Sequence, residues 1–234
     1  MNRISVKLIR FAAISMSALL FFAATAFAGP PLICHQIDIG SAKSLPWISH
    51  DWNLNGTESY DRKHLAADTL AILASDQTVL VHMETLRRAT LYARGDAVLA
   101  KQLLTMIVSD AKQGPTNGQS KALRMFDAGY LAEAYKQWLG EKGQNPASGL
   151  DGYALVREAI RLRGGSDPQM DFAAALISMS GQAQEHQEFA QKAIAGAKQD
   201  PLLARNLSTH FLGASTEPMA EMIGRNSGTK VAKQ

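Results

Sequence analysis

Apolar residues recur at helical spacing along most of this chain, and no segment shows the strict alternation of apolar and polar positions that is typical of a surface strand. From Glu58 onward, Ala, Leu, Met, Gln, Lys and Arg dominate, and apolar side chains return every three or four residues. Successive apolar stripes begin at Leu65, Val79, Leu99, Leu123 and Tyr153. The pattern predicts an all-α protein of about eight helices.

Three of the predicted helices carry clear boundary signals. Asp167-Pro168 and Asp200-Pro201 each place a side-chain acceptor at the N-cap and a proline at the first helical position, where its missing N–H costs nothing. We therefore expect helices to start at both prolines. Gly95 is expected to end the helix that contains the Val79 stripe.

Two positions within the stripes carry specific expectations. Met106 shares the apolar stripe of Leu99, Leu103 and Ile107 and is expected to face the core. His82 lies on the apolar face of its helix, where a hydrogen-bonded core histidine is commoner than a catalytic one.

Residues 1–28 have the pattern of a secretory signal peptide: a basic start, an apolar run over residues 11–22 and small residues at the end. The pattern predicts cleavage between Ala28 and Gly29, and hence an exported protein that is periplasmic or extracellular. The apolar run is shorter than the roughly 20 residues that span a bilayer, so we expect no stable membrane insertion after cleavage. A retained N-terminal anchor and a lipid anchor on Cys34 are the alternatives. For the lipid anchor, Ile33 stands where that motif requires a small residue.

Removing the signal peptide changes the charge of the protein. The full chain has 24 Lys and Arg against 21 Asp and Glu, and residues 1–28 contain three of the basic residues and none of the acidic ones. The remaining chain has a formal charge of zero, which argues against nucleic acid and anionic membranes as partners. The chain has one cysteine, so it has no internal disulfide and its stability must come from packing.

The composition divides the remaining chain into three parts. Residues 29–57 are rich in Pro, Gly and Trp and predict an extended arm. We expect Trp47 and Trp52 to pin this arm to the helices. Residues 58–212 form the predicted helical domain, and the small polar residues of 213–234 predict a flexible tail.

An internal repeat links the last helices. Ala159 and Ala193 lie 34 residues apart, and Pro168 and Pro201 lie 33 apart. This period and these small residues resemble the tetratricopeptide family. The resemblance implies antiparallel helix pairs stacked into a superhelix, with a concave surface that binds a protein or peptide partner; an irregular helical bundle is the alternative.

The same resemblance implies which residues would line the concave surface. Arg205 and Asn206, just after Asp200-Pro201, are the first candidates for partner binding, and Arg124 and Tyr130 are further ones. The arm, which begins Pro30-Pro-Leu-Ile-Cys-His, is similar to the N-terminal arms of exported bacterial proteins without an assigned activity.

Ligand-capable side chains gather near the arm. Cys34, His35 and His50 precede His64 and Asp68, which share a face of a predicted helix. Thiolate, imidazole and carboxylate groups are donors for zinc and copper, but this spacing matches no established metal motif. A solvated helix face with a buried thiol explains the same residues without a metal.

The chain shows no catalytic motif. The serine-containing stretch 177–181 lacks the first glycine of a nucleophile elbow. We therefore expect a non-enzymatic, cofactor-free, exported helical-repeat protein that binds a protein or peptide. The alternative is a metal-binding or thiol-redox protein built on Cys34, His35, His50 and His64.

Overall fold

The computed structural model describes residues 30–48, 54–75, 78–114, 118–139, 145–179 and 181–211. The predicted signal peptide with its cleavage site at Ala28 and Gly29 lies outside these residues, as do His50, Trp52 and the predicted tail 213–234.

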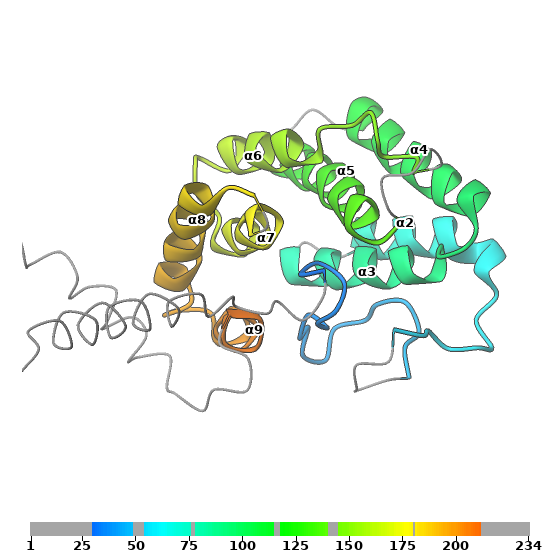
Figure 1. Cartoon of the computed structure of the whole chain (residues 1–234), viewed down its shortest axis with the longest axis horizontal. Helices are drawn as coiled ribbons and strands as arrows, with labels where there is room; N and C mark the ends of the chain where they lie inside the picture. Colours follow the sequence, from blue (N-terminus) through cyan, green and yellow to red (C-terminus); the bar gives the residue numbers. More distant parts are fainter. Residues whose placement is uncertain are drawn as a thin grey trace, which may run out of the picture.

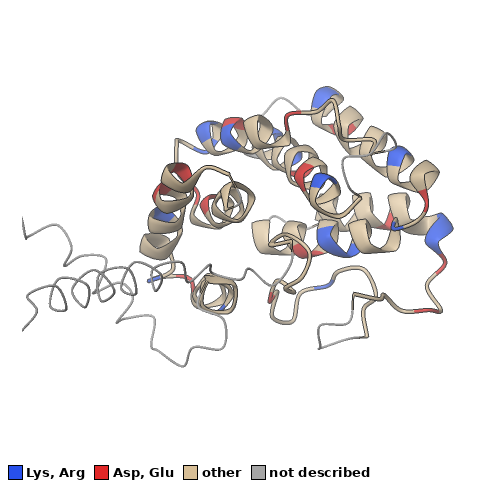
Figure 2. Ribbon diagram, in the orientation of Figure 1, with Lys and Arg blue, Asp and Glu red and all other residues tan. Residues whose placement is uncertain are grey.

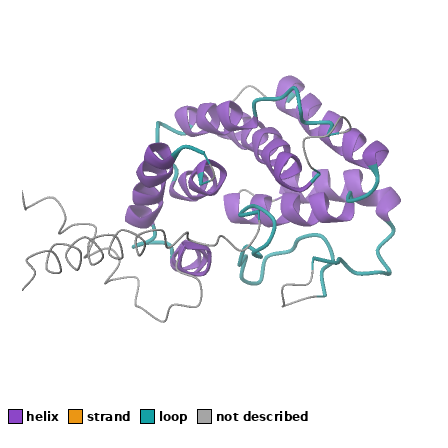
Figure 3. Ribbon diagram, viewed as in Figure 1, coloured by secondary structure: helices purple, strands orange, loops and turns teal. Residues whose placement is uncertain are grey.

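The described residues form eight α-helices and no strand, which confirms the predicted all-α class (Figure 3). With the labels of Figure 1, the helices are α2 (Leu65–Ser75), α3 (Val79–Tyr92), α4 (Ala97–Gln113), α5 (Gly118–Trp138), α6 (Gly152–Leu162), α7 (Pro168–Ser178), α8 (Ala183–Gly196) and α9 (Pro201–Phe211). A short 3-10 helix, η2 (Arg62–His64), precedes α2. No helix in the described part of the chain is long and apolar enough to cross a membrane.

Aspartates cap four of the helices. The carboxylates that accept a hydrogen bond from a backbone N–H of the first turn belong to Asp96, Asp151, Asp167 and Asp200. Each bond satisfies a donor that has no partner within the helix. The predicted helix starts at Pro168 and Pro201 are confirmed.

The end of α3 differs from the prediction. The helix stops at Tyr92, and the N–H of Ala93 bonds back to the carbonyl of Ala89. Gly95 lies in the following turn with a φ of 77°, a left-handed conformation that glycine adopts without steric cost. Gly95 therefore shapes the turn between α3 and α4 and does not cap α3.

Helices that follow one another in sequence pack as stacked pairs. The helix α4 lies against α5, α5 against α6, and α7 against α8. Central to the stack is α3, which contacts α2, α5 and α7 and is buried at every residue except Arg88. Figure 1 shows the helices following an arc from α4 round to α9, so that the last helix lies close to the N-terminal segment beneath α3.

The helices α5 and α6 approach each other closely at two glycines. A Cβ atom on Gly129 would lie 2.6 Å from the carbonyl oxygen of Gly152, and one on Gly152 would lie 2.5 Å from that of Gly129. Both distances are shorter than real Cβ contacts, so no larger side chain fits at either position without a shift of the backbone.

The arm has an irregular backbone, but it belongs to the core. Its buried apolar side chains are Leu32, Ile33, Ile37, Ile39 and Leu45, which share one cluster with the helices. Burial of such a side chain contributes about 1.5–3 kcal/mol. As predicted, Trp47 packs against a helix: its ring lies edge-on to that of Tyr92 in α3, with the ring centroids 5.8 Å apart.

Candidate functional site

Side chains of three helices hold the backbone of the arm. We call these residues the arm cradle: Glu84, Arg87 and Arg88 of α3, Gln137 of α5, and Asn206 of α9. Each of them makes a hydrogen bond to a backbone N–H or carbonyl of residues 32–45. Outside its own turns, the irregular arm therefore finds hydrogen-bond partners for its polar backbone groups in these side chains.

Glu84 is the centre of the arm cradle. Its carboxylate is fully buried and accepts hydrogen bonds from Arg87 Nε at 2.7 Å, from Arg88 Nε at 2.7 Å and from the N–H of Ile37 at 2.9 Å. The two arginines also donate to arm carbonyls, Arg87 to Ile33 and Arg88 to Leu45. A buried charge is tolerated only when it is paired and fully hydrogen-bonded, and this cluster meets both conditions.

Two predicted partner-binding residues, Arg205 and Asn206, do contact a peptide segment, but it is the chain's own arm. The amide of Asn206 accepts from the N–H of Asp38 at 2.7 Å and donates to its carbonyl at 2.8 Å. Arg205 Nε donates to the Asp38 carboxylate at 2.8 Å, and this bond lowers the pKa of Asp38 below its ordinary value. Asn206 is fully buried, so in this structure it faces the arm and is not available to an external partner.

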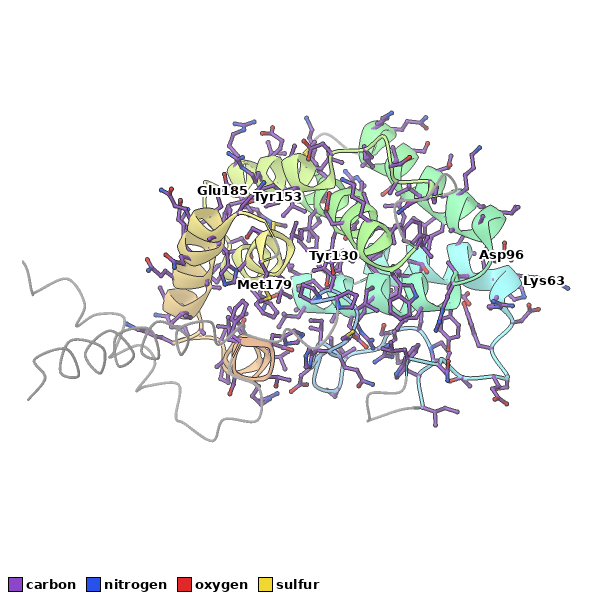
Figure 4. The ribbon with its side chains drawn as sticks, in the orientation of Figure 1. Lys63, Asp96, Tyr130, Tyr153, Met179 and Glu185 are labelled. Carbon is purple, nitrogen blue, oxygen red and sulfur yellow. The ribbon has the colours of Figure 1, made fainter. Side chains whose placement is uncertain are left out.

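Tyr130 is also an interior residue. Its side chain is fully buried and stacks on Phe126 with ring centroids 5.5 Å apart. Figure 4 shows it within the body of the molecule. Burial raises the pKa of its hydroxyl above the ordinary value. The predicted role in partner binding requires an exposed ring, and the structure corrects that expectation because α5 turns Tyr130 towards the core.

Arg124, the fourth predicted residue, lines a cavity of about 330 Å³ between α2, α3, α4 and α5. Its Nε lies 3.8 Å from the carboxylate of Asp110. Deeper in the cavity wall, His82 Nδ1 and Asp127 Oδ1 are 2.7 Å apart and both side chains are buried. Burial raises the pKa of Asp127, and His82 opposes that shift. His82 is thus the hydrogen-bonded core histidine that we expected, and the pair ties α3 to α5.

The metal-ligand candidates have separate surroundings. Cys34 is half-buried, and burial raises the pKa of its thiol. The ring of His35 lies 5.3 Å from that of His210 in α9. His64 is exposed, and its Nε2 lies 3.9 Å from Asp61 Oδ2. Asp68 instead accepts a hydrogen bond from the hydroxyl of Tyr60. Within the described ranges, no group of three or more His, Cys, Asp or Glu side chains could hold a metal ion.

A groove that the sequence did not reveal runs along the outer side of α4. We define the α4 groove by the two adjoining hollows, of about 960 and about 440 Å³, between α4 and residues 145–150. Leu104, Thr105 and Pro146 line both hollows. Two of the large apolar side chains that the described part of the chain exposes lie here: Val98, 79% exposed, and Met106, 36% exposed.

The exposure of Met106 corrects the prediction that it faces the core. The core stripe of α4 consists of Leu99, Leu103 and Ile107, and Met106 lies at its margin. An apolar residue next to a stripe continues the helical pattern whether or not a neighbouring helix covers it. The signal that could have pointed to the groove is Val98, an apolar residue on the polar side of the same helix.

The α4 groove has a positive lining. Lys101 and Lys112 line its two hollows, and no carboxylate stands among its described lining residues. These two lysines are the basic residues of α4, and Figure 2 shows basic bands on this helix.

Comparison with known proteins gives no relative for this chain. No family model, no curated protein and no solved structure matches it.

Proposed function

We propose that this protein is an exported, non-enzymatic helical scaffold that binds a segment of a partner protein in the α4 groove. The observation that carries the proposal is the exposure of Val98 and Met106 side by side with the hollows along α4. Apolar side chains gathered in an open groove are typical of surfaces that a partner covers.

The contrast with the arm cradle supports the choice of site. The arm occupies the cradle and satisfies its buried polar groups, so an external peptide would have to displace five buried apolar side chains. At about 1.5–3 kcal/mol each, such displacement would cost more than a typical peptide contact returns. The α4 groove needs no such rearrangement.

Export is the second part of the proposal and depends on the sequence of residues 1–28. Their basic start, apolar run and small residues before Gly29 support translocation and cleavage. Amino-terminal sequencing of the protein from a secretion-competent bacterial host tests this part. We expect the sequence to begin at Gly29, and an intact Met1 or a lipid-modified Cys34 would contradict the expectation.

The binding proposal is tested by selecting peptides from a random displayed library on the purified protein. We expect selected peptides to lose about tenfold in affinity for the Val98→Asp variant, because a covered valine contributes about 1.5 kcal/mol. Ala183→Asp, which places the same acidic side chain on the exposed first turn of α8, is the matched control and should bind as the wild type does. Failure to enrich any peptide, or peptides that bind both variants equally, would contradict the proposal.

A further inference from the structure

The two lysines of the α4 groove define a spacing that a partner has to match. Lys112 follows Lys101 by eleven residues on one helix. At 1.5 Å per residue their Cα atoms are about 16 Å apart, and at 100° per residue they lie within about 20° of the same face. Both side chains are exposed at the groove.

We infer that the α4 groove receives an amphipathic α-helix of a partner protein that carries two carboxylates eleven residues apart. The inference rests on the proposed function and adds the chemistry of the occupant. Charge complementarity is its first support. None of the ion pairs among the described residues involves Lys101 or Lys112, so both ammonium groups are available to an incoming carboxylate.

Geometry favours a helix over an extended peptide. In a helix that lies parallel or antiparallel to α4, residues eleven apart share one face and the same 16 Å separation. In an extended strand, a separation of about 16 Å corresponds to five residues, and residues five apart point to opposite faces. A strand could therefore satisfy one lysine directly but would turn its second carboxylate away.

The position of α4 in the fold supports the same occupant. On its inner side α4 packs against α5 and α2, and Figure 1 shows it at the outer edge of the helical stack. Its groove-lining positions include Val98, Thr105 and Lys112, which follow one another at intervals of seven residues. Heptad spacing is the pattern by which one helix packs along another. A partner helix would continue the stack by one layer.

The test uses three synthetic helical peptides of about 18 residues, with leucines at heptad a and d positions and different charged residues. The first carries two glutamates eleven residues apart, the second carries them five apart, and the third has lysines in place of the first peptide's glutamates. Binding to the full-length mature protein is measured by fluorescence anisotropy. We expect the first peptide to bind about tenfold more tightly than the lysine peptide, which forms neither ion pair, and about threefold more tightly than the second peptide, which still forms one.

Charge exchange makes the test specific. In the Lys101→Glu/Lys112→Glu double variant the preference should reverse, so that the lysine peptide binds more tightly than the glutamate peptide. If all three peptides bind the wild type equally and none binds the Val98→Asp variant, the inference of an acidic partner helix is wrong but the proposed function stands. If none of the peptides binds and the displayed library also yields none, the proposed function fails and the inference fails with it.

Discussion

The arm cradle and the α4 groove are two surfaces of one small protein, and they differ in whether their charged side chains have partners within the described part of the chain. In the cradle, Glu84 is buried and bonded to Arg87, Arg88 and the arm. In the groove, Lys101 and Lys112 are exposed and take no part in the ion pairs of the described residues. The arm already occupies the first surface, and we propose that a partner segment occupies the second.

The difference teaches that recognition of a peptide and availability to a partner are separate properties. The two-bond contact between Asn206 and the backbone of Asp38 is a sequence-independent way to hold an extended chain. Here it stabilises the fold, because the segment that it holds is covalently attached and contributes buried apolar side chains. Substitutions in the cradle should therefore change stability, and substitutions in the groove should change binding.

The largest effect should follow from Glu84→Ala in the cradle. The change removes the acceptor of two arginines and of the Ile37 N–H. Removing one member of a buried ion pair costs about 3–5 kcal/mol, and urea unfolding would measure it. Glu188→Ala, which breaks an exposed pair with Lys192, is the control and should cost at most about 1 kcal/mol. Equal losses for the two variants would show that the cradle is not the stabilising element.

The second largest effect should come from low pH, which should destabilise the packing of α9 through protonation of His210. Burial lowers the pKa of His210 to about 4, and its Nδ1 is bound to the carbonyl of Asn206. The unfolded chain, with an ordinary histidine pKa of about 6.5, binds a proton that the native state does not bind. The contribution of His210 to stability is therefore full above pH 6.5 and is lost as the pH falls from 6.5 to 4.

The expected loss from His210 is about 3 kcal/mol over that interval, since one pKa unit corresponds to about 1.4 kcal/mol. Urea unfolding of the wild type and of His210→Gln at several pH values would measure it. Glutamine does not titrate, so the variant should lose this part of the slope. Parallel pH profiles for the two proteins would contradict the assignment.

A smaller difference in stability is expected between substitutions of Asn206 and Arg205, two neighbouring residues that both contact Asp38. Asn206→Ala removes both bonds to the Asp38 backbone and should cost about 2 kcal/mol, because the arm N–H and carbonyl lose their partners. Arg205→Ala removes only a partly exposed ion pair and should cost about 0.5 kcal/mol. Thermal unfolding compares the two directly, and the reverse order would contradict the importance of the buried amide.

The smallest effect on stability should come from the groove. Lys101→Glu/Lys112→Glu changes two exposed side chains that have no ion-pair partner among the described residues, so the free energy of unfolding should stay within about 0.5 kcal/mol of the wild type. Chemical denaturation measures it. A loss as large as that of Asn206→Ala would mean that the lysines hold the fold together, and the contrast between the two surfaces would disappear.

Local signals were readable from the sequence. Asp167-Pro168 and Asp200-Pro201 marked helix starts because the capping carboxylate and the proline act within one turn of the helix. The burial of His82 could be predicted from its place on an apolar face. Its hydrogen bond to Asp127 could not be predicted, because the two residues are 45 positions apart and meet only through the packing of α3 on α5.

Long-range placement explains the errors at the candidate site. Asn206 and Asp38 are 168 positions apart, so no local pattern could show that Asn206 would bind the arm. Tyr130 turned out to be interior for the same reason, since α5 is enclosed by α3, α4 and α6. The prediction for Met106 was wrong in the opposite sense, because this residue is exposed and not buried. Its helix α4 lies at the edge of the stack, and the spacing of apolar residues does not distinguish a helix at the edge from one at the centre.

Hydrogen exchange with and without the two-glutamate peptide tests the central claim most directly, because it reports where a bound helix lies. We predict that protection will increase in residues 97–113 and 145–150, the two walls of the α4 groove, and will stay unchanged in residues 30–48 of the arm. Protection confined to the arm or to α9, with α4 unaffected, would contradict the assignment of the groove as the binding surface.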